Sequence, residues 1–329
     1  MPTTLANRSS LPFDLADQPF LVTGGAGFIG SHIVHRLVAG GARVRVLDAF
    51  TTGQRANLAD VLDRIELIEG DVNDMALVRY AVSDVAYVLH LAALVSVPES
   101  VDAPERNFDA NIVGTHNLLL AARDAAVRRF VFSSSCAVYG DHAAPHHEEL
   151  APRAFSPYAA AKLSGEQFCR SFTNVYGLPT VCLRYFNVFG PAQNPRGGYA
   201  AAIPLFMLAL LDGKSPQIYG DGHQSRDFVY VANVVDANLL ACAVDAAVGE
   251  VFNIGTGRET QLLELLAILG EQAGQIVEPT FAPARAGDIR HSYGDITRAT
   301  KILGYRPMID LATGLRETFD WYRTHAANF

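Results

Sequence analysis

The sequence predicts an α/β fold: a doubly wound parallel sheet with a smaller α/β lobe at its C-terminal end. Two observations carry this prediction. Short β-branched runs alternate with longer helical patterns through the first half of the chain, and this alternation is typical of parallel sheets that are covered by helices. After Arg184 the rhythm changes, and glycine, proline and asparagine become frequent. The second half is therefore expected to build a separate, smaller unit.

Six segments of the first half are predicted strands, because most are near-continuous apolar runs, as strands buried on both faces must be. They are residues 20–24, 43–48, 65–71, 85–90, 129–135 and 179–184. Helices are predicted between them. One carries Ile33 and Leu37 on one face and stops at Gly40, a residue that favours a helix end. Another carries Leu118 and Leu119 ahead of the strand at 129.

The second half begins with residues 186–204, whose glycine, proline and asparagine predict a long functional loop. The elements expected after it are short strands at 217–222, 227–231 and 251–255 and helices near 232–247, 260–273 and 310–325. The predicted domain organisation is an N-terminal extension (1–17), a nucleotide-binding domain (18–185) and a substrate-binding lobe (186–329). Some elements of the last segment are expected to return to the first sheet.

Composition narrows the function classes. Half of the 329 residues are hydrophobic and 18% are charged, which is enough apolar material for a sizeable core. The net charge of −8 argues against a nucleic-acid partner, because phosphate backbones require a basic surface. No apolar run is long enough to span a membrane, and none at the N-terminus predicts a signal peptide. We expect a cytoplasmic protein with no membrane partner, reduced cysteines and no metal site.

A glycine-rich loop follows the first predicted strand and opens the first predicted helix. Gly24, Gly27 and Gly30 form a G-x-x-G-x-x-G pattern within TGGAGFIGSH. Glycines let a backbone turn tightly and approach a pyrophosphate, which then lies at the positive end of the helix. Alone, such a pattern also fits a plain strand–helix turn. Its place between a strand and a helix predicts a dinucleotide site and a sheet of the Rossmann type.

Asp48 ends the next predicted strand, where a carboxylate accepts hydrogen bonds from both ribose hydroxyls of a dinucleotide. The same carboxylate would repel a 2′-phosphate, so NAD is predicted rather than NADP. Asp71 and Val72 follow the third strand, and small residues from Leu91 follow the fourth. These segments line the carboxyl edge of one parallel sheet, where ligands bind.

The stretch SPYAAAKLSGE, residues 156–166, predicts the catalytic groups. Ser156 is a good N-cap and Pro157 suits the first helical position, so Tyr158 and Lys162 lie one turn apart on one face. With 12 tyrosines and three lysines in the chain, only about 0.1 such spacings are expected by chance. An ammonium near the phenol is expected to lower its pKa from about 10 and make Tyr158 a general base. Ser135 ends the fifth strand and is expected to share its hydroxyl with substrate and tyrosine.

Together, VTGGAGFIGSH, Asp48, HLAAL, SSSCAVYG, SPYAAAK and LRYFNVFGP resemble the extended short-chain dehydrogenase/reductase family. Within it, the chain most resembles the nucleotide-sugar 4-epimerases that act on UDP-glucose and UDP-N-acetylglucosamine. The resemblance implies a catalytic triad of Ser135, Tyr158 and Lys162. The NAD contacts that it implies are Gly24, Gly27, Phe28, Ile29, Gly30, Asp48, Phe50, Thr52, Gly53, Asp71, Val72, Leu91, Ala92, Ala93, Val95, Asn111, Tyr158, Lys162 and Phe186. The UDP-sugar contacts that it implies are Ser135, Tyr158, Asn187, Ala201, Ala202, Tyr219, Arg226, Arg285, Asp288 and Ser292.

The implied reaction is a transient oxidation at sugar carbon 4, with hydride returned to the other face of a 4-keto intermediate. Related 4,6-dehydratases carry an Asp-Glu pair after the catalytic hydroxyl, whereas this chain has Cys136 and Ala137 there. Two alternatives stay open: a 4-epimerase of UDP-uronic acids, and a non-catalytic NAD-binding relative. The resemblance also implies a homodimer that associates through the helices near 107–124 and 157–175.

Ser292 is the residue on which the expected sugar preference depends. In the epimerases that the chain resembles, a tyrosine at the aligned position accompanies plain hexoses, and a small residue leaves room for an N-acetyl group. Serine therefore predicts that UDP-N-acetylglucosamine and UDP-N-acetylgalactosamine are accepted alongside UDP-glucose and UDP-galactose.

Overall fold

The computed structural model describes residues 13–195, 201–284 and 289–325, and a parallel sheet of seven strands lies at its centre. The strand order is β11-β6-β5-β4-β1-β2-β3, and every neighbouring pair is parallel. The strands are β1 (Pro19–Thr23), β2 (Arg43–Asp48), β3 (Ile65–Glu69), β4 (Tyr87–His90), β5 (Arg129–Ser135), β6 (Thr180–Tyr185) and β11 (Val251–Ile254). The predicted doubly wound fold is confirmed, and the order reverses between β1 and β4, where such sheets bind ligands.

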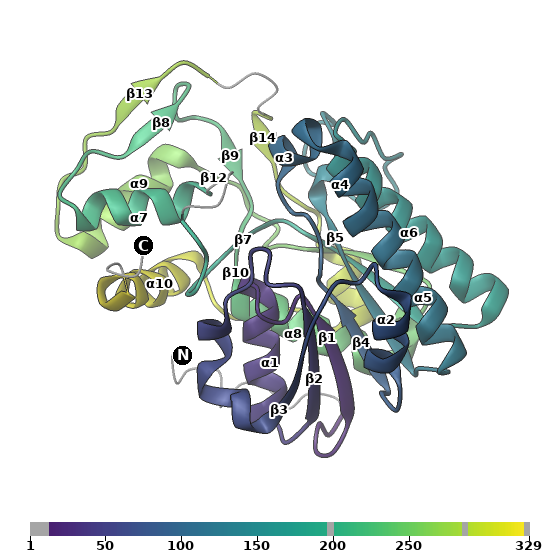
Figure 1. The fold of residues 1–329 in the computed structure, drawn as a ribbon. Coiled ribbons are helices and arrows are strands. Elements are labelled where there is room, and N and C mark those ends of the chain that lie inside the picture. Colours follow the sequence, from purple (N-terminus) through teal and green to yellow (C-terminus); the bar gives the residue numbers. More distant parts are fainter. Residues whose placement is uncertain (1–12, 196–200, 285–288, 326–329) are drawn as a thin grey trace.

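Two helical layers cover the sheet, one on each face (Figure 1). One layer holds α1 (Phe28–Ala39) and α8 (Val231–Ala243), and the other holds α2 (Met75–Val82), α5 (Gly114–Asp124) and α6 (Pro157–Tyr176). Ile33 of α1 packs in one core cluster with Val22 of β1. Leu118 of α5 packs in the other cluster with Leu21, the neighbour of Val22 on the same strand. Alternate strand residues therefore bury opposite faces of the sheet, as the continuous apolar runs predict.

The chain between β4 and α5 and the chain after β6 add shorter elements. Before α5 lie α3 (Val97–Asp102), α4 (Pro104–Phe108) and a π-helical turn (Asp109–Val113). After β6 come β7 (Asn187–Phe189), α7 (Ala202–Leu211), β8 (Gln217–Tyr219), β9 (Ser225–Arg226), β10 (Phe228–Tyr230), a 3₁₀ turn (Asp245–Ala247), β12 (Thr260–Gln261), α9 (Leu262–Ala273), β13 (Thr280–Ala282), β14 (His291–Ser292), a π-helical turn (Ala299–Leu303) and α10 (Leu311–His325). Among them, α7, β8, β12, α9 and β13 lie in the upper left part of Figure 1, whereas β11 pairs with β6 and extends the main sheet.

The predicted loop at 186–204 is wrong at both ends. It contains β7, which pairs in parallel with β10, and α7 begins at Ala202. The glycine, proline and asparagine content of this segment concealed a three-residue strand whose partner lies far along the chain. Short strands of this kind are stabilised by pairing and not by local propensity.

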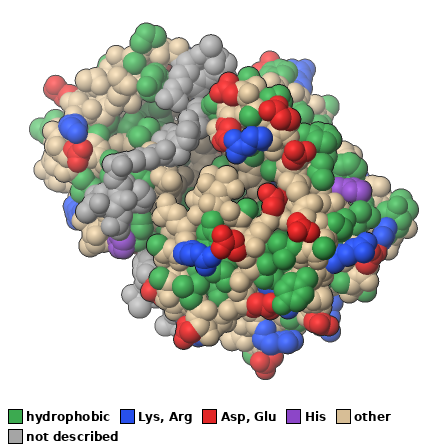
Figure 2. All heavy atoms as spheres, in the orientation of Figure 1, with side chains coloured by type: hydrophobic (Ala, Val, Ile, Leu, Met, Phe, Trp, Pro, Cys, Tyr) green, Lys and Arg blue, Asp and Glu red, His purple; other side chains and the backbone are tan. Residues whose placement is uncertain are grey.

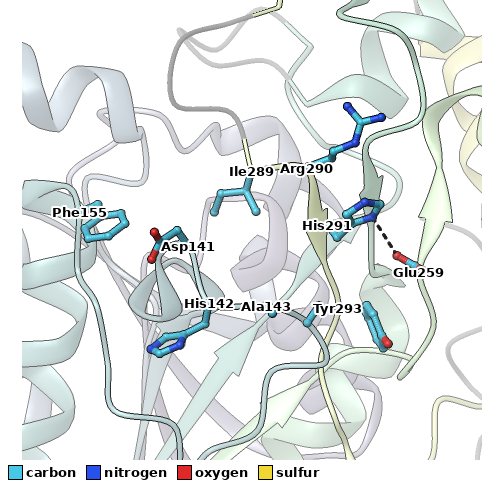
Figure 3. A pocket seen from close by; sticks show the side chains of 10 residues that line it. Asp141, His142, Ala143, Phe155, Glu259, Ile289, Arg290, His291 and Tyr293 are labelled. Carbon is cyan, nitrogen blue, oxygen red and sulfur yellow. Dashed lines mark ion pairs between the residues drawn. The ribbon is translucent and has the colours of Figure 1, made fainter.

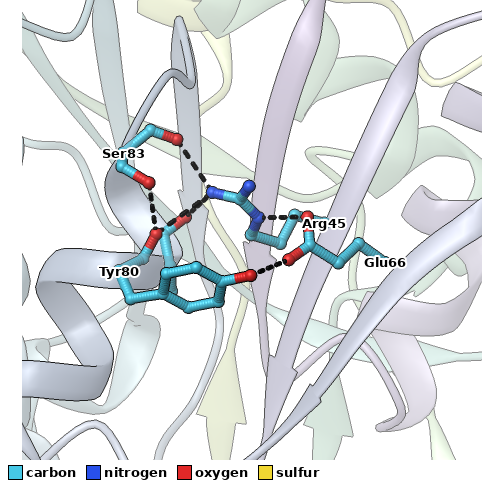
Figure 4. Close-up of polar contacts among 5 residues, drawn as sticks. Arg45, Glu66, Tyr80 and Ser83 are labelled. Atoms are coloured by element: carbon cyan, nitrogen blue, oxygen red, sulfur yellow. Dashed lines mark hydrogen bonds and ion pairs between the residues drawn. The ribbon is translucent and has the colours of Figure 1, made fainter.

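Arg45 joins the edge of the sheet to the carboxyl end of α2 (Figure 4). Its Nε donates to Glu66 on β3 at 2.7 Å, and its Nη1 donates to the carbonyl oxygens of Tyr80, Ala81 and Ser83 at 3.1, 2.9 and 2.8 Å. The Tyr80 hydroxyl donates to the same Glu66 carboxylate at 2.8 Å. A cation at a helix C-terminus satisfies carbonyls that have no partner within the helix. The contacts hold α2 against β2 and β3, the strands that end at the predicted ribose site.

The surface carries both signs of charge. On the described part of the face in Figure 2, acidic and basic side chains are interspersed, and no basic patch gathers there. No helix within the described ranges is both long and apolar enough to cross a membrane.

Part of the predicted N-terminal extension packs on the sheet domain. Leu15 is 4% exposed, and the Phe13 ring lies 5.7 Å from that of Tyr87. The remainder of that extension, residues 1–12, lies outside the described residues.

Candidate functional site

The glycine loop between β1 and α1 is built for close backbone approach. Gly24 has a φ of +67°, and a Cβ atom there would lie 2.7 Å from the amide nitrogen of Ala92. A Cβ atom on Gly30 would overlap the carbonyl oxygen of Gly24. Gly27 is the N-cap of α1, so the free N–H groups of the first turn begin at Phe28 and Ile29. This is the geometry that holds a pyrophosphate at a helix N-terminus.

Asp48 lies at the end of β2, as predicted, and also braces the glycine loop. One carboxylate oxygen accepts from the amide of Ala26 at 2.8 Å, and the other accepts from the amide of Phe50 at 2.8 Å. The side chain is 6% exposed. Each carboxylate oxygen has a second lone pair, so these bonds leave acceptor capacity for ribose hydroxyls. The bracing role was not predicted, because sequence alone does not show which backbone amides face a carboxylate.

The segment after β2 surrounds the same carboxylate. Phe50 has a φ of +53°, and the guanidinium of Arg55 lies 4.5 Å from the centre of its ring. A Cβ atom on Gly53 would lie 2.8 Å from Asp48 Oδ1, so glycine is required for this approach. Thr52 is exposed.

The other predicted cofactor residues also follow strand ends. Asp71 and Val72 follow β3, where Asp71 accepts from the Asn73 amide at 2.8 Å and Val72 is buried. Leu91, Ala92 and Ala93 follow β4 and are half-buried, whereas Val95 is 61% exposed.

Asn111 and Phe186 make protein contacts that sequence analysis did not foresee. Asn111 accepts from the Leu94 amide at 2.8 Å and donates to the Leu94 carbonyl at 2.9 Å, which fixes the loop after β4. Phe186 is 4% exposed and stacks with the rings of Tyr139 and His146 at 6.5 and 6.3 Å.

A buried histidine links the strand before the glycine loop to α5. His90, the last residue of β4, bonds the hydroxyl of Thr23 at 2.8 Å and that of Thr115 at 2.9 Å. The amide of Ala92 donates to the same Thr23 hydroxyl at 3.2 Å. Burial, with the charge of Lys162 as a second cause, lowers the pKa of His90 to about 3. The imidazole is therefore neutral and adds no charge to the site. The sequence did not predict that His90 bonds these two hydroxyls, because no pattern distinguishes a single histidine at a strand end.

The catalytic helix begins as the sequence predicts. The amide of Ala159 donates to the Ser156 hydroxyl at 3.1 Å, and Pro157 is the first residue of α6. Tyr158 and Lys162 lie on one face, with Lys162 Nζ at 5.8 Å from the centre of the phenol ring. The ammonium donates to the carbonyl oxygen of Ser133 at 2.8 Å. The predicted pair is thus brought together beneath the end of β5.

The structure corrects the prediction that Lys162 lowers the pKa of Tyr158. Burial raises the pKa of Tyr158 to about 12, and a hydrogen bond from Ser135 offsets only part of this effect. Burial also lowers the pKa of Lys162 to about 8. Both groups lose water, and the ammonium is directed at a carbonyl, so the loss of solvation outweighs their attraction. With protein groups alone around it, Tyr158 stays protonated at neutral pH.

Ser135 lies where the two segments meet. It ends β5 and caps a 3₁₀ helix (Cys136–Tyr139), accepting from the Ala137 amide at 3.2 Å. Its side chain also lies close enough to Tyr158 to lower the pKa of the phenol in part. Burial raises the pKa of the Cys136 thiol to about 11, so the thiol beside the serine stays protonated.

The residues predicted to bind a substrate come from several short strands. Arg226 of β9 and Ser292 of β14 are direct partners in a parallel pair, and Ser292 is 6% exposed. Asn187 begins β7, and its amide donates to the carbonyl of Asp227 at 2.9 Å. Tyr219 ends β8. Ala201 caps α7, and Ala202 is its first residue. Arg285 and Asp288 lie outside the described residues.

A cavity of about 710 Å³ lies beside these strands (Figure 3). Its lining residues are Asp141, His142, Ala143, Ala144, Phe155, Glu259, Ile289, Arg290, His291 and Tyr293. The triad is absent from this lining. His291 and Tyr293 flank Ser292 and line the cavity, so Ser292 faces the other side of β14. Within the ranges that the structure describes, no cluster of three or more His, Cys, Asp or Glu residues is arranged to hold a metal.

Comparison with known proteins agrees with this geometry. Residues 20–255 match the model of the NAD dependent epimerase/dehydratase family. The UDP-glucose 4-epimerase of Mycolicibacterium smegmatis is 42% identical over 308 residues, which cover 92% of this chain and 98% of that protein.

Two solved structures are similar to the whole fold. The UDP-N-acetylglucosamine 4-epimerase from Methanobrevibacter ruminantium, in complex with UDP-N-acetylmuramic acid, has a TM-score of 0.90 and 39% identity, covering 94% of this chain and 99% of that one. The UDP-glucose 4-epimerase of Thermotoga maritima with UDP-glucose has a TM-score of 0.89 and 40% identity, covering 93% and 99%.

Proposed function

Because the chain belongs to the NAD-dependent epimerase/dehydratase family, with NAD as its cofactor, we propose that it is a 4-epimerase of UDP-hexoses. The proposed substrates are the pair UDP-N-acetylglucosamine and UDP-N-acetylgalactosamine, and also the pair UDP-glucose and UDP-galactose. The relatives described above carry both kinds of name, UDP-glucose and UDP-N-acetylglucosamine 4-epimerase.

The observation that carries the proposal is the meeting of three groups at one strand end. Ser135 lies beside the Tyr158 phenol and lowers its pKa in part, and Lys162 is held on the same helix face by the Ser133 carbonyl. β4 lies between β1, which leads into the glycine loop, and β5, which ends at Ser135, so the nucleotide site and the acid–base groups share one sheet edge. Such an edge orients a sugar between a hydride acceptor and a base.

The fit of the site to NAD rests on the same residues. Only glycine at positions 24 and 30 lets the loop pack this closely against Ala92 and against itself at the start of α1, and Asp48 keeps acceptor capacity beside it. NAD bound there supplies a hydride acceptor and a positive charge near the phenol. A positive charge favours the ionised phenol, as does the ammonium of Lys162. Tyr158 then takes the proton from the hydroxyl on sugar carbon 4 and later returns it, while Ser135 orients that hydroxyl.

The substrate residues act on the end that does not react. Arg226 is proposed to bind the pyrophosphate, because a guanidinium offers paired donors to phosphate oxygens. Its partner in the strand pair is Ser292, which is proposed to border the sugar's 2-substituent. A small side chain there leaves room for an N-acetyl group. Binding through the UDP end lets the 4-keto sugar turn over without leaving the site.

Rival activities of the family are less well supported by the residues present. Cys136 and Ala137 occupy the positions after the catalytic hydroxyl, and neither provides the acid–base pair that water elimination needs. The protonated state of the Cys136 thiol agrees with a packing role. A 4-epimerase of UDP-uronic acids is the second candidate, since all but three of the 26 lysines and arginines are arginines, which can pair with a carboxylate. A non-catalytic relative would not be expected to keep all three triad residues.

A homodimer is also proposed. Exposed hydrophobic side chains lie on and beside the helices expected to associate, among them Val101, Phe108, Val175 and Tyr176, each more than half exposed. Burying such side chains against a second copy is favourable. Sedimentation equilibrium tests this, and a monomer at micromolar concentration would contradict it.

A panel of UDP-sugars tests the activity. Purified protein is incubated with the N-acetylated, plain and uronic forms, and the epimers are separated by chromatography. We expect the protein to interconvert the two N-acetylated sugars, and also to interconvert UDP-glucose and UDP-galactose. Conversion of UDP-glucuronic acid alone would favour the second candidate, and conversion of none would overturn the proposal.

A further inference from the structure

A third residue shares the face of α6 that carries the catalytic pair. Tyr158, Lys162 and Glu166 follow one another at four-residue intervals, so they lie in a row on one side of the helix. The phenol of Tyr158 lies beside Ser135 at the end of β5, where the serine side chain lowers the pKa of the phenol in part. Glu166 is 2% exposed, and the mechanism described above gives it no role.

These residues of α6 lie against the last residues of β5. Lys162 Nζ donates to the carbonyl oxygen of Ser133 at 2.8 Å. The hydroxyl of Ser134 donates to Glu166 Oε1 at 2.5 Å. Two consecutive serines of β5 therefore contact two successive positions on this helix face, and the next serine, Ser135, lies beside the third position, Tyr158. These contacts fix the position of α6 along the direction of β5.

Arg184 of β6 holds Glu166 in place. Its Nε donates to Glu166 Oε1 at 2.8 Å, and its Nη2 donates to Oε2 at 2.7 Å. Arg184 is 3% exposed and is the direct strand partner of Ser134. A buried carboxylate that receives a two-point arginine contact is held in one rotamer, and the pair has no net charge. Glu166 thus adds no unpaired negative charge that would oppose ionisation of the phenol.

The same arginine reaches the chain on the other side of Ser135. Its guanidinium lies 4.8 Å from the centre of the Tyr139 ring, at the end of the 3₁₀ helix. The Tyr139 hydroxyl donates to Asn253 of β11 at 2.6 Å. The residues before and after the serine are therefore both tied to the Glu166–Arg184 pair.

We propose that Glu166, acting through Ser134, is a positioning residue that sets the distance between the Ser135 hydroxyl and the Tyr158 phenol. This inference rests on the proposed function for its catalytic meaning. The titratable groups that face Tyr158 are Lys162 on its own helix and Cys136 on the 3₁₀ helix. Those around Glu166 are Arg184 and Cys182 of β6.

Ser134→Ala tests the proposal, because it removes one hydrogen bond and leaves the ion pair and all of those groups in place. A hydrogen bond to the ionised phenol favours ionisation, so a looser contact with Ser135 raises the pKa of Tyr158. The titration of Tyr158 is read in the NAD-bound protein without sugar, as the difference in phenolate absorbance between each protein and its Tyr158→Phe form. We expect an upward shift of about half to one unit, the size of one moderate hydrogen bond.

Turnover gives a second readout. In Ser134→Ala at pH 7, kcat is expected to fall about 3- to 10-fold, because a smaller fraction of Tyr158 is ionised, while KM stays within about twofold of the unmodified protein. The kcat of the variant is expected to recover as the pH rises and more of the phenol ionises. Tyr185→Phe is the matched control: it removes the hydroxyl of another buried residue, bonded to Ser133 and Asn238. This variant is expected to keep the pH profile. If Ser134→Ala fails to fold, Ser134→Cys gives the same comparison with a weaker donor of similar shape.

The outcomes separate this inference from the proposed function. A protein that epimerises no UDP-sugar would overturn the function, while the phenolate titration would still decide the positioning role. An unchanged titration in Ser134→Ala, with only the midpoint of thermal unfolding lowered, would show a purely structural contact and overturn the inference. An equal shift of the Tyr158 pKa in Tyr185→Phe would also overturn the inference.

Discussion

Lys162 Nζ lies 2.8 Å from the carbonyl oxygen of Ser133, and this bond directs the ammonium at the strand as well as at the phenol of Tyr158. The geometry explains why the lysine alone does not ionise the tyrosine. Burial raises the pKa of Tyr158 to about 12 and lowers that of Lys162 to about 8, so a further positive charge is needed to make the phenol a base near neutral pH.

Tyr158→Phe should nearly abolish turnover while the protein stays folded, since it removes the base and keeps the ring. A loss of about 10²–10⁴-fold in kcat is expected for a general base. Ser135→Ala should be severe but less complete. Tyr80→Phe is the control, because its hydroxyl bonds Glu66 at the sheet edge, away from the triad. Retention of most activity by Tyr158→Phe would show that the proton takes another path.

Lys162→Met should lower kcat at pH 7 by about tenfold or more, because loss of the cation raises the pKa of Tyr158. The sign of the pH dependence follows from two groups. The variant's rate should rise with pH as more phenol ionises. The wild-type ammonium is present below its pKa of about 8 and is lost above it, so the wild-type advantage should narrow above pH 8. A rate ratio that stays constant from pH 6 to 10 would contradict this account.

Much of this site follows from local sequence patterns. Ser156 and Pro157 predict where α6 begins, and the spacing predicts that Tyr158 and Lys162 share a face; both are confirmed. The ends of the six strands predicted in the first half lie within two residues of those in the structure, because parallel strands are continuous apolar runs.

The remainder depends on contacts between distant segments. Glu166 and Arg184 form a buried pair across α6 and β6, and His90 bonds hydroxyls from β1 and α5. No periodicity marks such partners. The direction of the Tyr158 shift was also missed, because the loss of solvation depends on burial, which a sequence does not show.

Asp48→Ala should weaken the preference for NAD over NADP, because the carboxylate that would repel a 2′-phosphate is removed. It should also reduce NAD affinity, since Asp48 braces the amides of Ala26 and Phe50. Titration calorimetry with both dinucleotides measures the two effects. Glu69→Gln, at the exposed end of the neighbouring strand, is the control. Equal binding of both cofactors by the unmodified protein would contradict the role given to Asp48.

Gly30→Ala should abolish NAD binding and lower the midpoint of thermal unfolding, because the new Cβ atom would overlap a backbone oxygen of the loop. Gly40→Ala, at the other end of α1, is the matched control. Its Cβ atom would lie 2.6 Å from Cδ1 of Leu15, a side chain that can move aside. If both variants bind NAD equally well, close backbone approach is not what the glycine loop provides.

Ser292→Tyr should lose the N-acetylated substrates and keep UDP-glucose and UDP-galactose. The added ring would fill space beside Arg226, and an overpacked wall costs about 1–3 kcal/mol, or roughly 5- to 150-fold in kcat/KM. His291→Tyr is the control, because His291 lines the cavity on the other side of the strand. An unchanged ratio of kcat/KM for the two substrate pairs would show that Ser292 does not set the preference.

The central claim is that carbon 4 of a UDP-sugar is inverted by removal and return of its own hydrogen. Epimerisation of UDP-N-acetylglucosamine and UDP-glucose in D₂O, followed by proton NMR at position 4, tests it most directly. The account predicts that both epimers form and that the hydrogen on carbon 4 is retained, because the hydride is held in the site and never exchanges with water. Deuterium on carbon 4 of the product would contradict the account, and so would the absence of any epimer.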